Sequence, residues 1–197
     1  DASWSRGLGD VYKRQILASQ SEVRKKILQD NGIKCLSEPS KVDEDTVKES
    51  LLKEGSNPEF ISKNLAELKA NKISAKFPDK IVIGADSVID LNGNIISKPK
   101  DRDEALEILK KLNGKKHYLI SSVCISRNGG MIWNHTDKAE LIMKNFSIVE
   151  LSDYLSKISD KNLYSYNVYQ IEGQGKNLFE EINGCLLYTS DAADESV

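Results

Sequence analysis

The sequence IVIGADS at residues 81–87 contains the clearest strand signal in the chain and indicates the class of fold. A short run of branched apolar residues followed by a glycine is typical of a buried strand in an α/β protein. The glycine lets a ligand approach the backbone closely. Asp86 comes soon after this run, so we expect its carboxylate at the carboxyl end of a buried strand, where open α/β sheets bind their ligands.

Predicted strands and helices alternate on both sides of this segment. ILA at residues 16–18 predicts a short buried strand, and an Asn-Gly hairpin is expected at residues 91–94. Alternating polarity predicts antiparallel strands at 117–126 and 131–145, and a further strand is expected at 168–172. Apolar periodicity, N-cap residues and terminal glycines predict helices near residues 22–31, 46–53, 57–73, 101–113 and 152–158. We therefore predict one α/β unit with a mixed sheet and flanking helices.

The composition excludes several classes of protein. The chain has 197 residues, with 28 basic and 30 acidic side chains and three cysteines. This length suits one domain or two small ones, and no apolar run approaches the roughly 20 residues of a membrane-spanning helix. The near-zero net charge indicates neither a nucleic-acid nor a membrane partner. The cysteines lack the spacing of a disulfide framework or a zinc site, which favours a reducing cytoplasm.

The two ends of the chain share one short DNA element. A DNA sequence encoding DVYKRQ, residues 10–15, also encodes CLLYTS, residues 185–190, when its opposite strand is read. The element resembles the end of a sequencing adapter. We interpret residues 1–15 and 185–197 as adapter-derived tails, and residues 16–184 as a domain whose C-terminal end is missing. We expect residues 1–14 and 188–197 not to pack into the core. Without the charges of the tails, this domain is electrically neutral.

A cluster of hydroxyl residues and one arginine lies at the first strand–helix turn. SQSEVR at residues 19–24 would place free backbone N–H groups and the positive end of a helix dipole at this turn. Arg24 can add a bidentate pair of donors, so the turn is a candidate anion site. The same pattern also fits Ser21 as an ordinary N-cap and Arg24 as a solvated side chain. The sequence leaves both interpretations open.

Three carboxylates and one lysine are further candidates for binding a metal ion or a phosphate. Asp43 and Glu44 lie on a polar loop, and Asp86 follows the buried strand. Magnesium is usually held by one or two carboxylates together with substrate phosphates, so these residues are candidate ligands. A solvated loop and a turn-forming aspartate are the alternatives. Lys98 precedes Pro99, which fixes the local path of the chain and directs the ammonium in a way that suits a phosphate.

The remaining reactive side chains show no such pattern. Lys69 lies on a predicted helix and, taken alone, would be a solvent-facing charge. His117 and His135 have no serine or cysteine partner at a recognisable spacing, so we expect structural roles for both. Cys35 and Cys124 are expected to be small buried apolar residues, since nothing near them indicates an activated thiolate.

These groups, in this order, resemble the motifs of the Maf nucleoside triphosphate pyrophosphatases. The matching segments are LASQSEVR (17–24), PSKVDE (39–44), NLAELKA (64–70), GADS (84–87), SKP (97–99), LNGKKHYLISSV (112–123) and YQIEG (169–173). In the family's opening motif, LASxSPRR, Glu22 replaces the proline and Val23 replaces the first arginine. The resemblance covers residues 16–184.

The resemblance implies an elongated, two-lobed α/β fold related to the inosine triphosphate pyrophosphatases, with a nucleotide in the cleft between the lobes. It implies Mg²⁺-dependent hydrolysis of a nucleoside triphosphate to the monophosphate and pyrophosphate by a cytoplasmic homodimer. The implied site residues are Asp86 and Lys98 for catalysis, Glu44 and Asp86 for Mg²⁺, and Ser19, Ser21, Arg24, Lys69, Ser87 and Glu172 for the substrate. Glutamate at 172 resembles the 7-methyl-GTP group, which favours a guanine-like or modified base over dTTP and UTP.

Two alternatives stay open at this point. One is a nucleotide-binding regulator of cell division that does not turn over its ligand. The presence of both Asp86 and Lys98 favours turnover, since a protein that only binds has little need for a carboxylate facing phosphates. The other is an inosine or xanthosine triphosphate pyrophosphatase of the related fold, which substrate profiling would separate.

Overall fold

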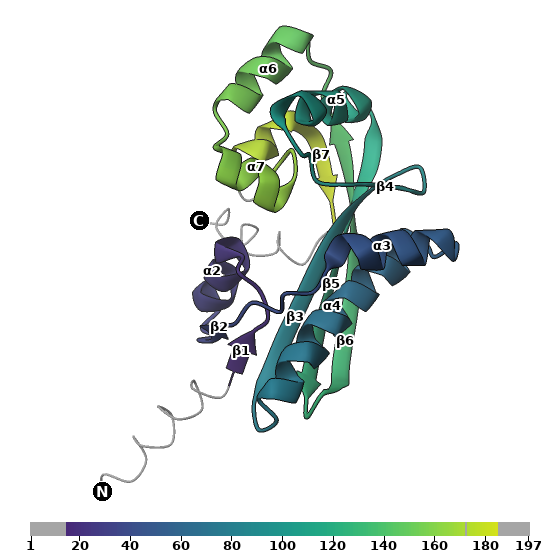
Figure 1. Cartoon of the computed structure of the whole chain (residues 1–197). Helices are drawn as coiled ribbons and strands as arrows, with labels where there is room; N and C mark the ends of the chain where they lie inside the picture. Colours follow the sequence, from purple (N-terminus) through teal and green to yellow (C-terminus); the bar gives the residue numbers. More distant parts are fainter. Residues whose placement is uncertain (1–14, 172, 185–197) are drawn as a thin grey trace, which may run out of the picture. The chain divides into compact units, whose positions relative to one another are not determined.

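The structure is a computed structural model that describes residues 15–171 and 173–184 (Figure 1). Nearly all of both predicted tails lies outside the described residues, as does Glu172. Gln15, assigned above to the first tail, is described and pairs with Ile81. Within these two ranges no helix combines the length and the apolar character that crossing a membrane requires.

The strands form one mixed sheet, as predicted. They are β1 Gln15–Leu17, β2 Leu36–Ser37, β3 Ile81–Leu91, β4 Asn94–Ile96, β5 Lys116–Arg127, β6 Gly130–Met143 and β7 Phe179–Asn183. Their order is β2-β1-β3-β5-β6-β7, with β4 paired to β3. The pairs of β1 with β2 and β3 are parallel, whereas β3 with β4 and β6 with β7 are antiparallel. The predicted mixed α/β sheet is confirmed.

Side-chain caps define where the helices begin. The helices are α2 Glu22–Asp30, α3 Glu44–Lys53, α4 Pro58–Lys76, α5 Arg102–Leu112, α6 Ile148–Ser156, α7 Asp160–Tyr166 and the 3₁₀ helix η2 Gln174–Leu178. Each of these α-helices follows a residue whose side chain accepts a hydrogen bond from the first turn. At α4, for example, Asn57 Oδ1 lies 2.8 Å from the backbone nitrogen of Phe60. The structure confirms five predicted helices, and α7 and η2 were not predicted.

Two strand predictions were wrong. β3 does not end near Asp86 but continues to Leu91, because Ile89 and its neighbours pair with β4. Asp86 therefore lies inside a strand and is buried, with 4% of its surface exposed. Residues 168–171 were predicted to lie in a strand but form none. Their apolar character reflects burial in a core, and the following strand is β7.

The chain divides into two compact units, each with its own core. Of the described residues, the first unit contains 15–87 and 121–136, and the second contains 88–120, 137–171 and 173–184. The core of the first unit consists of Ile16, Ala18, Ala66, Ala70, Ile73, Val82 and Cys124. The core of the second is larger and joins β6, α5 and α6 to Tyr169 and Phe179. The nucleotide cleft implied by the resemblance stays a prediction.

In the first unit, α4 lies directly against β3 (Figure 1). A Cβ atom at Gly84 would overlap the carbonyl oxygen of Ala66 and would lie 2.7 Å from the backbone nitrogen of Ala70. Both alanines are completely buried. Three small residues therefore allow the backbones of the helix and the strand to touch.

In the second unit, His117 is a buried structural residue. Its side chain is completely buried, and Nε2 lies 3.0 Å from the hydroxyl oxygen of Tyr169. The imidazole also packs against the rings of Tyr169 and Phe179. Burial lowers the pKa of His117 to about 4, so the ring is neutral at pH 7.

We expect Gly84→Ala to lower the free energy of unfolding by about 1–3 kcal/mol, the usual cost of overpacking a core. The added methyl group must move α4 away from β3. Gly130→Ala is the matched control, because a Cβ there would lie 3.9 Å from its nearest neighbour, the carbonyl oxygen of Arg127. Denaturant unfolding of both variants measures the difference. An equal change in both would contradict the role given to the helix–strand contact.

We also expect His117 to make unfolding easier in acid. The histidine binds a proton near pH 6.5 when unfolded but only near pH 4 when folded, so acidification between these values favours the unfolded state. This shift corresponds to about 3 kcal/mol. The free energy of unfolding should therefore fall more steeply in this range for the parent than for His117→Gln. Parallel pH curves would disprove the assignment.

Candidate active site

Lys69 joins two carboxylates in the first unit. Its Nζ lies 2.7 Å from Oδ1 of Asp86 on β3 and 2.8 Å from Oε1 of Glu44 at the start of α3. Lys69 and Asp86 are 5% and 4% exposed, so this is a buried ion pair. Lys48 makes a longer contact of 4.0 Å with Glu44. Considered without the family motifs, Lys69 was expected to face solvent. That expectation was wrong, because α4 presents this residue to β3.

The second carboxylate oxygen of Asp86 has no hydrogen-bond partner in the part of the chain that the structure describes. Oδ2 is buried, and Oδ1 alone contacts Lys69. A buried carboxylate oxygen without a partner is costly and usually indicates an unseen water or ion, or a catalytic function. The geometry therefore leaves one oxygen of Asp86 to receive a proton or a cation.

The neighbours Asp43 and Glu44 have different functions in the structure. Asp43 caps α3 and accepts hydrogen bonds from the backbone nitrogen and the hydroxyl of Thr46, which lower the pKa of Asp43. Glu44, one residue later, reaches Lys69 instead. The preceding loop contains Lys41, whose φ of 49° is unusual for a side chain with a Cβ. Lys72 Nζ donates to the carbonyl of Lys41 at 2.6 Å, so α4 also supports this loop.

The hydroxyl residues at the first turn are held by backbone hydrogen bonds. Ser19 Oγ accepts from the nitrogen of Ser21 at 3.1 Å, and Ser21 Oγ accepts from the nitrogen of Arg24 at 3.3 Å. Each hydroxyl keeps its own hydrogen to donate. The Arg24 guanidinium is not merely solvated, since Nη1 donates to the carbonyl of Ala85 at 2.9 Å. Arg24 therefore lies beside the segment of β3 that carries Asp86.

Two serines that were not among the predicted site residues also contact this segment. Ser62 Oγ on α4 donates to the carbonyl of Asp86 at 3.2 Å, and Ser121 Oγ on β5 lies 3.0 Å from Ser87 Oγ. Helical spacing places Ser62 on the same face of α4 as Lys69, seven residues later, so periodicity could have found it. No local signal places Ser121 next to Ser87, because the two residues are far apart in sequence.

No contact between this group and the other two predicted site residues is described. Lys98 belongs to the second unit, where it lies exposed between β4 and α5 beside the buried Pro99. Glu172 lies outside the described residues. Within the described residues, no three histidine, cysteine or acidic side chains gather in a way that would hold a metal ion by themselves. Glu44 and Asp86, which share Lys69, are the carboxylates best placed to hold one together with substrate oxygens.

Comparisons with known proteins agree with the motifs. The chain is 71% identical over 174 residues to a nucleoside triphosphate pyrophosphatase of Pelagibacter ubique, an alignment covering 88% of this chain and 89% of the relative. It is 38% identical to a nucleoside triphosphate pyrophosphatase of Ruegeria sp. and 36% identical to a 7-methyl-GTP pyrophosphatase of Rhizobium etli. Each of these two alignments covers 86% of this chain and 85% of the relative.

Among solved structures, the Staphylococcus aureus Ham1 protein aligns with 66% of this chain and 72% of its own. The identity is 18% and the TM-score 0.35, which is too distant to support an argument. The sequence profile of the Maf family, described as Maf-like protein, matches residues 14–188. The motifs, the profile and the curated relatives agree, and the chain belongs to the Maf-like protein family.

Proposed function

We propose that this protein hydrolyses a nucleoside triphosphate to the nucleoside monophosphate and pyrophosphate. The observation that carries the proposal is the buried Asp86, which has one oxygen on Lys69 and the other without a partner among the described residues. The names of the relatives, nucleoside triphosphate pyrophosphatase and 7-methyl-GTP pyrophosphatase, support the same reaction. We further infer that the substrate base is guanine-like or modified, and that the protein acts as a cytoplasmic homodimer.

The first turn and its neighbours would bind the phosphates. Ser19 and Ser21 each keep a hydroxyl hydrogen to donate, and the N-terminus of α2 adds the positive end of a helix dipole. Arg24 supplies a guanidinium whose remaining N–H groups can bind phosphate oxygens. Lys98 would add a second cation from the segment before α5. These groups offset the charge that gathers on the transferred phosphoryl group.

Glu44 and Asp86 would hold the magnesium ion. Both side chains suit the ion because both are carboxylates and both contact the ammonium of Lys69. In addition, Oδ2 of Asp86 is buried without a partner in the described part of the chain. The ion, when bound, stabilises charge on phosphoryl oxygens and makes a bound water more acidic. The remaining ligands would come from the substrate phosphates and water.

Asp86 would act on the attacking water. Lys69 fixes the carboxylate through Oδ1, and Ser62 fixes the backbone of the same residue through its carbonyl. Oδ2 can then either orient the water and accept its proton as the water attacks the α-phosphorus, or help to hold the magnesium ion that would make this water more acidic. Lys69 would neutralise charge near the phosphates. Ser87 would donate its hydroxyl hydrogen to the substrate, with Ser121 as its neighbour.

We expect Asp86→Asn to lower the rate of pyrophosphate release by about 10²–10⁴-fold, the usual effect of losing a general base. The fold should survive because Lys69 keeps Glu44 as a partner at 2.8 Å. Asp90→Asn is the matched control, since Asp90 is a second buried aspartate of β3 whose Oδ1 accepts from the turn residue Gly93. Pyrophosphate release and the thermal transition are measured for both variants. A rate for Asp86→Asn within about threefold of the parent would overturn the mechanism.

We expect Glu44→Gln to weaken the binding of Mn²⁺, used as a paramagnetic substitute for Mg²⁺, by about tenfold or more. The amide keeps the size of the side chain but removes the charge that a cation requires. Glu49→Gln on the exposed side of the same helix should bind Mn²⁺ like the parent. Free Mn²⁺ is measured by electron paramagnetic resonance in the presence of a non-hydrolysable triphosphate. Equal affinities of the two variants would exclude Glu44 as a ligand.

A further inference from the structure

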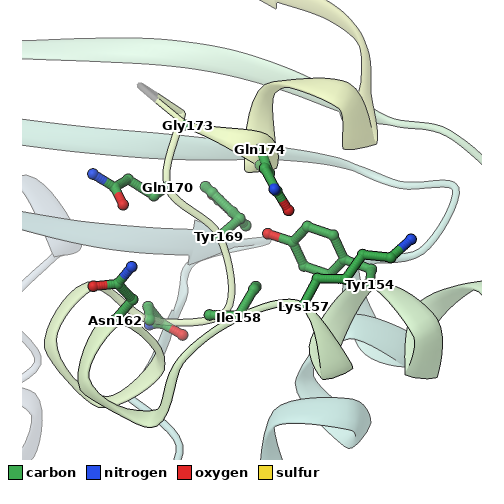
Figure 2. A pocket seen from close by; sticks show the side chains of 10 residues that line it. Tyr154, Lys157, Ile158, Asn162, Tyr169, Gln170, Gly173 and Gln174 are labelled. Carbon is green, nitrogen blue, oxygen red and sulfur yellow. The ribbon is translucent and has the colours of Figure 1, made fainter.

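The cavity in the second unit does not suit a metal ion (Figure 2). Its volume is about 260 Å³, and its wall includes Tyr154, Gln170 and Gln174. No carboxylate occurs in the described lining, and the one charged residue there, Lys157, has its ammonium 2.6 Å from a carboxylate oxygen of Asp153. Divalent cations such as Mg²⁺ favour acidic oxygen ligands. The carboxylates around Lys69 in the first unit therefore stay the candidate ligands.

The loop of residues 38–43 leads into α3 and sets the position of Glu44, the first residue of that helix. Hydrogen bonds fix both ends of the loop. Glu38 donates its backbone N–H to the carbonyl of Leu17 at 2.9 Å, and the carboxylate of Asp43 accepts from the backbone nitrogen of Thr46 at 3.1 Å. Residues 39–42, between these points, form neither helix nor strand. The path of the loop therefore depends on the few contacts that these four residues make.

One side chain of α4 holds the middle of this loop. Lys72 Nζ donates to the backbone carbonyl of Lys41 at 2.6 Å. In the part of the chain that the structure describes, this is the one hydrogen bond that residues 39–42 make. The donor is charged, and hydrogen bonds from charged donors are shorter and stronger than those between neutral groups. Lys72 therefore fixes the loop close to the point where α3 begins.

The backbone at Lys41 needs such support. Its φ of 49° lies in the left-handed region, which residues with a Cβ rarely adopt. A backbone in this conformation persists only where the surrounding structure fixes it. The ammonium of Lys72 bonds to the carbonyl of this same residue. A charged donor thus contacts the loop at the residue whose backbone conformation is least favourable.

Two lysines of α4 contact the segment 41–44 in different ways. Lys69 is buried, and its ammonium binds the carboxylate of Glu44 at 2.8 Å. Lys72 is exposed and lies three residues later on the same side of the helix. Among the described residues, it bonds to the carbonyl of Lys41 and makes no contact with a carboxylate. Lys72 can therefore affect Glu44 only through the backbone that joins the two contacts.

We propose that Lys72 is a positioning residue, which holds the carbonyl of Lys41 and thereby places the carboxylate of Glu44 where the divalent cation binds. The inference rests on the proposed function, because it takes Glu44 to be a ligand of that cation. The effect of Lys72 passes through the backbone of residues 41–44. Metal sites commonly depend in this way on groups that orient the ligands without contacting the metal.

The test uses Lys72→Met, which keeps the aliphatic part of the side chain and removes the ammonium. The affinity of the full chain for Mn²⁺ is measured by electron paramagnetic resonance in the presence of a non-hydrolysable triphosphate. It should fall about 3- to 10-fold, the effect of one lost hydrogen bond. The sign of the change is decisive, because removing a positive charge near a metal site would by electrostatics alone strengthen Mn²⁺ binding.

Two further variants separate the hydrogen bond from the general charge of α4. Lys72→Arg keeps a charged donor and should bind Mn²⁺ within about twofold of the parent. Lys76→Met is the matched control, because Lys76 is an exposed lysine of the same helix without a hydrogen bond or ion pair among the described residues. It should bind Mn²⁺ like the parent.

A double variant shows whether Lys72 acts through Glu44. In the Glu44→Gln background, Lys72→Met should change Mn²⁺ affinity by less than about twofold, because the ligand that it positions has already lost its charge. Unchanged or tighter Mn²⁺ binding by the single variant Lys72→Met would overturn the proposal. An equal loss of affinity in both backgrounds would also overturn it.

Hydrogen exchange gives a readout that needs no metal ion. The amides of Thr46 and Val47 bond to Asp43, so a loosened loop should weaken this cap. Both amides should exchange about 3- to 10-fold faster in Lys72→Met than in the parent and the Lys76 control. Exchange at the parent rate would contradict the hold of Lys72 on the loop. If Glu44→Gln left Mn²⁺ affinity unchanged, the metal site of the proposed function would fail instead, and hydrogen exchange would still test this hold.

Discussion

The contact between α4 and β3 at Gly84 is the constraint on which the candidate active site depends. Lys69 and Asp86 are both buried, and a buried charge without a partner costs several kcal/mol. The pair is tolerable only if the two side chains meet closely, and they do so at 2.7 Å. Gly84 and Asp86 lie on the same face of the strand, since side chains alternate along it. The absence of a side chain at Gly84 thus sets the distance at which the charged pair forms.

Local signals predicted most of the elements, because they act over a few residues. The Asn-Pro-Glu start of α4 and the Asn-Gly turn between β3 and β4 combine capping and turn chemistry that needs no tertiary contact. Features that depend on distant partners were not predictable in this way. The continuation of β3 past Asp86 follows from its pairing with β4, and residues 168–171 are apolar because they are buried, although they form no strand.

The same distinction between local signals and distant contacts holds for the residues of the candidate site. The family motifs point to Asp86 and Glu44, whereas the local charge pattern alone does not separate Glu44 from Asp43, since both are acidic residues of one loop. The difference arises at the helix start, where Asp43 caps the backbone and Glu44, the next residue, contacts Lys69 on α4. Lys69 has no local signal of burial, and only the packing of α4 on β3 brings its charge to Asp86. A single sequence therefore indicates which residues belong to such a site more readily than it indicates which of them contact one another.

The candidate phosphate-binding groups of the first unit do not all depend on the same contacts. Arg24 donates to the carbonyl of Ala85, one residue before Asp86, so the position of its guanidinium follows that of β3. Val23, where the family's motif has an arginine, removes a candidate phosphate donor next to Arg24 in the sequence. The buried pair of Lys69 on α4 and Asp86 on β3 does not involve this position. In this arrangement, the strength of the proposed phosphate binding and the proposed action of Asp86 on water can vary independently.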